Sequence, residues 1–317
     1  MSTETFQPDL PPVEETLAYE AQQRPRVIAA AIFGGLGSFA GALLLSLTFS
    51  GGPNEGDGFI GLPEAMQARL EGRAPEGPSL FVRQVQFYGD HAAQLCAAAV
   101  LTALATMAIA YVLIHLYRAT AARMPISRTP LIASVIALVA FPIGHLVQRL
   151  SSWLGAASFD GDTAEEARDI FQSSFTAAGQ IFELLGQFAL STAILLVALN
   201  AMRAGLLTRF LGVLGIIVGV LAFPIIEAFN IDPPRLIRMW WMLGIALLIG
   251  GKLRGGLPPA WVTGRAEPWP SQQELREARE RARGGGGGGE PSGSVVADAD
   301  PATGETAGQR RKRKKRR

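Results

Sequence analysis

The sequence predicts an all-α fold, a bundle of six transmembrane helices followed by a disordered cytoplasmic C-terminal tail. Apolar runs that approach twenty residues alternate with polar loops between residues 27 and 254. Charged residues make up only 18% of the chain and gather in the loops and at its two ends, and the mean hydropathy is +0.24. About 20 apolar helical residues cover roughly 30 Å, the thickness of a bilayer's hydrocarbon core, so these runs are typical of membrane spans.

The N-terminal tail, residues 1–26, is polar and precedes the first apolar run. It contains Glu14, Glu15 and Glu20, which is the wrong pattern for a cleavable signal peptide with a short basic start. The pattern predicts a short surface helix that stops at Pro25, because proline cannot donate the next helical hydrogen bond. We expect the first apolar run to be retained as a helix.

The transmembrane domain, residues 27–254, is expected to contain spans at residues 27–48, 92–116, 129–147, 177–199, 210–229 and 236–253. In the first span, Gly37 and Gly41 are four residues apart, a spacing that lets another helix approach closely. Before the second span, Phe81, Val85 and Tyr88 recur at i, i+4 and i+7. This spacing predicts a helical turn that lies on the membrane interface.

The distribution of basic residues predicts that both termini lie in the cytoplasm. Arg and Lys near the span ends are somewhat more numerous on the side of the termini, and the turns at 117–128 and 200–209 contain no acidic residue. Short cytoplasmic loops of membrane proteins carry an excess of Lys and Arg. The sequence therefore predicts a multi-pass protein of a bacterial plasma membrane.

The C-terminal tail, residues 255–317, has a different composition from the rest of the chain. A short polar helix is expected at 271–283, followed by a glycine linker at 284–289 and a disordered stretch. The chain closes with eight consecutive basic residues: Arg310, Arg311, Lys312, Arg313, Lys314, Lys315, Arg316 and Arg317. Besides the lipid bilayer itself, anionic lipid is the expected partner of this run, with an unknown protein or a merely solubilising role as alternatives. No aromatic residue is interleaved, which argues against nucleic acid.

Several kinds of site are excluded or unsupported by the residues present. Cys96 is the single cysteine, so an intramolecular disulfide and a cysteine metal cluster are both impossible. The sequence contains no HExxH, GxSxG or GxxxxGK[ST] pattern. We therefore assign no catalytic residue, no cofactor and no metal ligand, and the sequence sets no oligomeric state.

A short motif recurs near the ends of the third and fifth spans. AFPIGH at 140–145 matches AFPIIE at 222–227, and the same offset of 82 residues carries the second span onto the fourth. Each copy follows a basic turn. The match indicates either a duplicated helical hairpin, as found in many transporters, or a coincidence of four residues within apolar sequence.

Polar residues inside the apolar runs predict a seam within the bundle. Glu183 and Gln187 fall on one helix face, and His145 follows the first proline motif. Polar groups in lipid must face protein or water, so we expect them to meet. The candidate seam comprises His91, Gln94, His145, Arg149, Gln180, Glu183, Gln187 and Glu227.

Two interpretations of this seam remain open. In the functional one, Glu183 and Glu227 act as carboxylates and His145 as base or ligand for a proton, a metal ion or a small polar molecule. In the structural one, these residues lie near the outer interface, where His and Glu reach the headgroups and Arg149 pairs with a carboxylate. The sequence alone favours the structural interpretation.

Two stretches carry a resemblance to a known family. LNAMRAGLLTRFLGVLGIIVGVL, around the turn before the fifth span, and PPAWVTGRAEPWPSQQE, after the sixth, are its clearest words. With them, residues 20–275 resemble an uncharacterised family of bacterial six-helix integral membrane proteins of the domain-of-unknown-function kind, frequent in actinobacteria. The resemblance implies six helices and a plasma-membrane location, and it implies no activity.

The leading functional hypothesis from the sequence is a non-enzymatic membrane-organising or regulatory protein. The first alternative is a small transporter or proton-coupled carrier that uses an outward-opening polar seam. A weaker alternative is a membrane-embedded metal-dependent hydrolase. The sequence does not identify a substrate for any of them.

Overall fold

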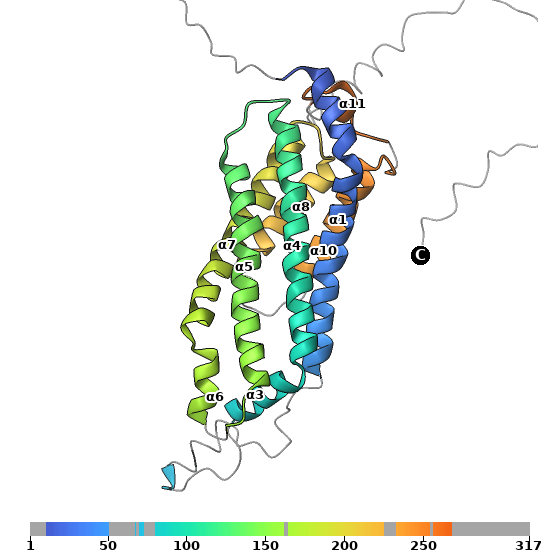
Figure 1. The fold of residues 1–317 in the computed structure, drawn as a ribbon. Coiled ribbons are helices and arrows are strands. Elements are labelled where there is room, and N and C mark those ends of the chain that lie inside the picture. Colours follow the sequence, from blue (N-terminus) through green and yellow to red (C-terminus); the bar gives the residue numbers. More distant parts are fainter. Residues whose placement is uncertain are drawn as a thin grey trace, which may run out of the picture. The chain divides into compact units, whose positions relative to one another are not determined.

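The computed structural model describes residues 11–50, 67, 70–72, 80–161, 164–224, 233–253 and 256–267, and its elements are all helical there (Figure 1). The helices are α1 (Val13–Ser50), α3 (Leu80–Asp90), α4 (Ala92–Ala121), α5 (Thr129–Ala157), α6 (Ala164–Phe171), α7 (Ser174–Arg203), α8 (Arg209–Leu221), α10 (Pro233–Ile249) and α11 (Pro259–Thr263). The predicted all-α class is therefore confirmed. The calls on Glu227 and on residues 271–317 lie outside the described residues.

Four helices, α1, α4, α5 and α7, contain segments long and apolar enough to cross a membrane. They run side by side along the whole bundle, from the end that carries α11 to the end that carries α3 and α6 (Figure 1). We call these the α11 end and the α3 end. The chain therefore has the character of a membrane protein.

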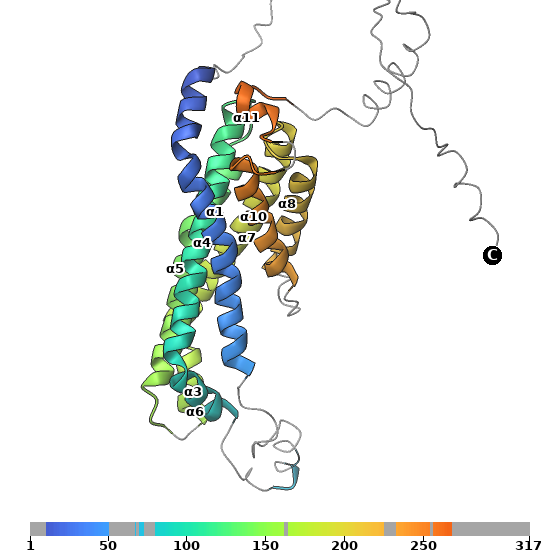
Figure 2. The same cartoon turned by 90° about the vertical axis from the view of Figure 1, so that its right-hand side faces the viewer.

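The helices α8 and α10 are shorter, with 13 and 17 residues. At 1.5 Å per residue α8 covers about 20 Å, less than a hydrocarbon core. Both lie beside the half of the bundle nearer the α11 end (Figure 2). The expected fifth and sixth spans thus appear as helices over 209–221 and 233–249, and residues 225–232 between them are not among those described.

The predicted helix stop at Pro25 is wrong. The helix α1 begins at Val13 and continues through Pro25 to Ser50, with a bend in its upper part (Figure 2). A proline inside a helix costs one hydrogen bond and kinks the helix without always ending it. Here buried contacts hold the preceding turns: Glu20 is only 6% exposed and forms an ion pair with Arg123.

Small residues set the distances between the long helices. A Cβ atom added to Gly37 would lie 3.2 Å from the Ala105 Cβ, and one added to Gly41 would lie 2.5 Å from the Thr102 Oγ1. The predicted close approach at this glycine pair is confirmed, and the partner is α4 of the same chain. The α3 helix expected from its apolar spacing is also present, with Val85 fully buried.

The helix bounds extend the sequence repeat. The helices α4 and α7 each have 30 residues, and α7 both begins and ends 82 residues after α4. The second halves of the copies differ, because α5 continues through Pro142, whereas α8 ends at Leu221 before Pro224. The equal bounds of α4 and α7 support a duplicated hairpin.

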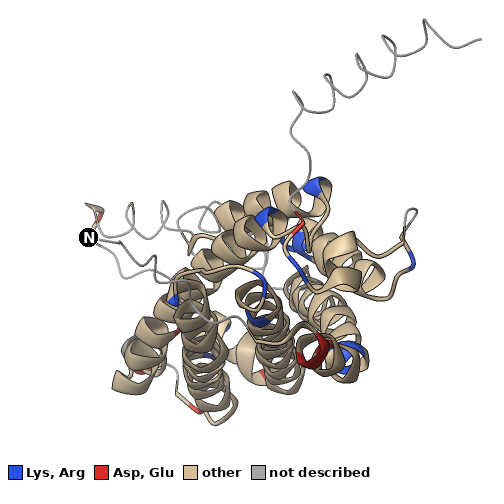
Figure 3. Ribbon diagram, turned by 90° about the horizontal axis from the view of Figure 1, so that it is seen from above, with Lys and Arg blue, Asp and Glu red and all other residues tan. Residues whose placement is uncertain are grey.

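The segment after α10 folds back over the α11 end. Trp261 is buried, and its Nε1–H donates to the Leu206 carbonyl at 2.8 Å, while the Glu267 N–H donates to the Ala204 carbonyl at 3.1 Å. Between these acceptors Gly205 has φ of 76°, in the left-handed region that favours glycine. The two stretches that carry the family resemblance therefore contact each other. Figure 3 views this end and shows Lys and Arg on several of the helices that meet there.

Candidate functional site

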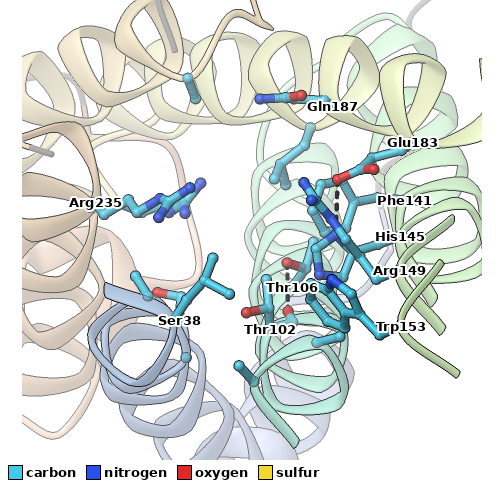
Figure 4. Close-up of a pocket in the computed structure, with 18 residues that line it drawn as sticks. Ser38, Thr102, Thr106, Phe141, His145, Arg149, Trp153, Glu183, Gln187 and Arg235 are labelled. Atoms are coloured by element: carbon cyan, nitrogen blue, oxygen red, sulfur yellow. Dashed lines mark hydrogen bonds and ion pairs between the residues drawn. The ribbon is translucent and has the colours of Figure 1, made fainter. Parts of the chain in front are cut away.

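A polar cavity of about 190 Å³ lies within the bundle and extends from the middle of α4, α5 and α7 toward the α3 end; Figure 4 shows the side chains that line it. Residues of α1, α4, α5, α7 and α10 line it, together with Ala222 just after α8. The cavity thus lies beside the C-terminal end of α8 and the N-terminal start of α10. Its lining combines charged, hydroxyl and apolar side chains.

A histidine–glutamate pair forms one wall. The Nδ1 of His145 on α5 lies 2.8 Å from the Oε1 of Glu183 on α7, and the two side chains are 12% and 15% exposed. When Glu183 is ionised, the Nδ1–H of His145 donates to the carboxylate, and Nε2 is the ring nitrogen that takes no part in this contact. The Phe141 ring stacks on the imidazole, with centroids 5.4 Å apart. The pair therefore places an imidazole and a carboxyl group in direct contact within the cavity lining.

Glycines bring α5 and α7 close enough for this pair to form. A Cβ added to Gly144 would clash with the backbone nitrogen of Glu183, and one added to Gly186 would clash with the backbone nitrogen of Phe141. The two backbones are therefore almost in contact on both sides of the pair. Such close packing fixes both side chains relative to each other.

Three arginines face the same cavity. Arg149 comes from α5, and its guanidinium carbon lies 5.8 Å from the centroid of the Trp153 ring. Arg235 and Arg238 come from the first two turns of α10. Figure 4 shows Arg235 entering the cavity from the side opposite to His145 and Glu183. The described lining residues thus include three arginines and one acid, Glu183.

The structure brings together His145, Arg149, Glu183 and Gln187 from the predicted seam. The other members in the described part of the chain lie elsewhere. Gln94 and Gln180 are exposed, and the Nδ1 of His91 is bonded at 3.0 Å to the carbonyl oxygen of Phe87. Gln94 lies about one turn and His91 about two turns before Ala98, the first residue of α4 that lines the cavity, and neither of them lines it.

Sequence reasoning missed Arg235 and Arg238 as cavity residues. A signal was present, because both lie at the start of the sixth apolar run, at i and i+3 on one helix face. A charged side chain in such a run normally faces protein or a cavity rather than lipid. Trp153 and the hydroxyl residues Ser38, Thr102 and Thr106 complete the polar lining.

No family model, curated protein or solved structure matches the chain. The chemistry of the site must therefore be judged from its own residues. Within the described ranges, no group of three or more His, Cys, Asp or Glu side chains is placed to hold a metal ion. Among the described residues the cavity lining contains two such side chains, His145 and Glu183, which is fewer than the three protein ligands of a typical catalytic zinc site.

Proposed function

We propose that the protein is a multi-pass membrane carrier that binds a small polar solute in the central cavity and couples its movement to a proton at His145 and Glu183. The observation that carries this proposal is the placement of the pair. Glu183 and His145 are 15% and 12% exposed, and they contact each other at 2.8 Å inside the cavity. This mutual contact weakens the structural interpretation, in which headgroups satisfy these residues.

Energetics supports the same conclusion. Ionisable groups within membrane spans are costly and are kept mainly where they serve an ion, proton or ligand pathway. A neutral, well-packed core would be less expensive than a cavity that holds three arginines, a histidine and a glutamate. Discontinuous helices and internal repeats that meet at a polar site are also recurrent features of carriers.

The proposal includes six spans with both termini in the cytoplasm of a bacterial cell. The basic turns around Arg123 and Arg203 lie at the α11 end, which would face inward. The fifth and sixth spans would be α8 and α10 together with residues outside the described ranges. The resemblance to the six-helix family of unknown function likewise remains a prediction.

Transport by reconstituted protein tests the carrier proposal. Full-length protein in liposomes that contain a pH-sensitive dye would be challenged with inorganic phosphate, glutamate, choline and glycerol. At least one solute should drive proton movement into the lumen in wild-type vesicles. The Glu183→Gln variant should reduce that movement at least tenfold, because it removes the carboxylate that pairs with His145.

The matched control is Glu14→Gln, the same chemical change at an exposed residue in the first turn of α1. It should transport like wild type. If Glu183→Gln lowers only the yield of folded protein and leaves the rate per folded molecule unchanged, the pair is structural and the carrier proposal fails.

A second candidate function rests on the C-terminal basic run rather than on the cavity. Eight consecutive Lys and Arg residues at the cytoplasmic surface would attract anionic lipid at about 1 kcal/mol per residue. This supports a membrane-organising or regulatory role, the leading hypothesis from the sequence alone. Because of the cavity, we favour the carrier proposal over this second role, and the two roles are compatible.

A further inference from the structure

We propose that the solute bound in the cavity is a small organic anion, with a carboxylate head held by Arg149 and Arg235 and a short apolar body. This inference names the ligand class of the proposed carrier site. It rests on the proposed carrier function in one respect, namely that the bound anion is transported. Charge, helix orientation and lining each support it.

The charge of the cavity favours an anion. Arg149 and Arg235 face it together, and the one carboxylate among the described lining residues already accepts a hydrogen bond from His145. Like charges repel strongly inside a low-dielectric bundle, so an arrangement of this kind is stabilised when an anion binds between them. Arginine is suited to this role because its planar guanidinium matches a carboxylate with two parallel hydrogen bonds.

The orientation of α10 adds to this charge. The helix begins at Pro233, and its first turn contains no acidic residue but does contain Arg235. The start of a helix carries partial positive charge, so basic residues there are unfavourable unless an anion compensates them. Arg235 at the start of α10 lines the cavity, so an anion bound there would supply this compensation.

The rest of the lining favours a short apolar body. Phe141, Trp153, Leu45 and Leu190 share the cavity with the arginines. A volume of about 190 Å³ corresponds to roughly six water molecules at about 30 Å³ each. This volume suits a compact metabolite-sized ligand.

Binding of three matched probes tests the inference. Purified full-length protein in detergent would be titrated by calorimetry with butyrate, butyramide and butylamine, which share one short apolar body and differ in the charge of the head. Butyrate should bind, and the neutral and cationic probes should bind at least tenfold more weakly. Inorganic phosphate at equal ionic strength serves as the anion without a body, and it should also bind more weakly than butyrate.

Variants locate the binding. Arg149→Gln and Arg235→Gln should each weaken butyrate binding about tenfold or more, as expected for loss of a charge-assisted hydrogen bond. Arg203→Gln is the matched control, since Arg203 is an exposed arginine at the end of α7, and it should bind like wild type. Arg235→Lys, which keeps the charge, should retain part of the affinity and guards against misfolding of the glutamine variants.

The inference is overturned if butylamine binds better than butyrate, or if butyrate binds all four variants equally. Failure of the carrier proposal would appear differently. Butyrate binding that depends on Arg149 and Arg235, with no proton movement in liposomes driven by the four solutes above or by butyrate beyond that in protein-free liposomes, would leave the anion site standing and remove the transport function. Proton movement driven by choline, without butyrate binding, would support the transport function and rule out the anion site.

Discussion

Arg123 is a buried cation whose partners come from three separate parts of the chain. Its Nη2–H donates to Glu20 Oε2 at 2.9 Å, its Nη1–H to the Ala119 carbonyl at 2.8 Å and its Nε–H to the Ala260 carbonyl at 3.0 Å. The guanidinium also lies over the Trp261 ring, 5.5 Å from its centroid. One side chain thus connects α1, α4 and α11, and it explains how α1 continues past Pro25.

Removing the charge of either Glu20 or Arg123 should destabilise the protein, and the two variants should differ in how much stability they lose. Loss of one partner of a buried ion pair typically costs about 3–5 kcal/mol, because the other charge stays buried without compensation. Arg123→Gln should lie at the upper end, since it also removes the hydrogen bonds to Ala119 and Ala260, and Glu20→Gln at the lower end. The measurement is the midpoint of thermal unfolding in detergent.

The control for this prediction is Arg118→Gln. Arg118 is exposed and donates to the Tyr19 hydroxyl at 3.1 Å, so its loss should shift the midpoint little. The double variant of Glu20 and Arg123 should be more stable than the sum of the single changes implies, because no charge is left alone. Strict additivity would mean that the pair does not interact.

At the residue scale the sequence predicted part of the cavity. His145 and Glu183 could be found because each interrupts an apolar run, where polar groups must face protein or water. Arg235 could not be assigned in the same way, since an arginine near the end of a span also serves as an interfacial anchor. Which role it takes depends on how α10 is rotated, and that depends on packing against other helices.

At the scale of elements, the α5–α7 contact holds the cavity together. Gly144 faces the backbone of α7, where an added Cβ would lie 2.6 Å from the Phe182 carbonyl carbon and 2.7 Å from the Gly179 oxygen. Backbone atoms cannot move aside as a side chain can. The distance between the two helices is therefore set by the absence of a side chain at this position.

Gly144→Ala should separate the helices and lower stability by about 1–3 kcal/mol or more, the usual cost of overpacking. It should also weaken transport, because the His145–Glu183 contact depends on the same distance. Gly155→Ala on the same helix is the control, since its Cβ would meet only the Ile170 Cγ2 at 3.1 Å. Equal unfolding midpoints for the two variants would contradict this account of the contact.

Element boundaries were less predictable than element types. The long helices lie where the apolar runs predicted them, but α4, α5 and α7 extend beyond the expected spans at one or both ends. Hydropathy marks the part that suits lipid, whereas a helix continues as long as its hydrogen bonds and contacts persist. The second proline motif shows the opposite, because α8 ends at Leu221 where the matching α5 continues.

At the scale of the whole molecule, the arrangement of helices makes a consistent prediction of topology. The chain passes from the α11 end to the α3 end in α1, returns in α4, and repeats this in α5 and α7 (Figure 1). The excess of basic residues in the short turns at the α11 end predicts that this end faces the cytoplasm. Ser158, which follows α5 at the α3 end, would then face outward.

Cysteine labelling in intact cells tests this topology. In a Cys96→Ala background, a membrane-impermeant maleimide should label Ser158→Cys from outside and should label Ser271→Cys only after the cells are permeabilised. Asn230→Cys should also be labelled from outside, because the six-span proposal places the connection between α8 and α10 at the outer surface. Labelling of Ser271→Cys in intact cells would invert the orientation. If Asn230→Cys reacts only after denaturation, the two short helices do not reach the outer surface, and the protein has four complete spans with a hairpin that enters from the cytoplasmic side.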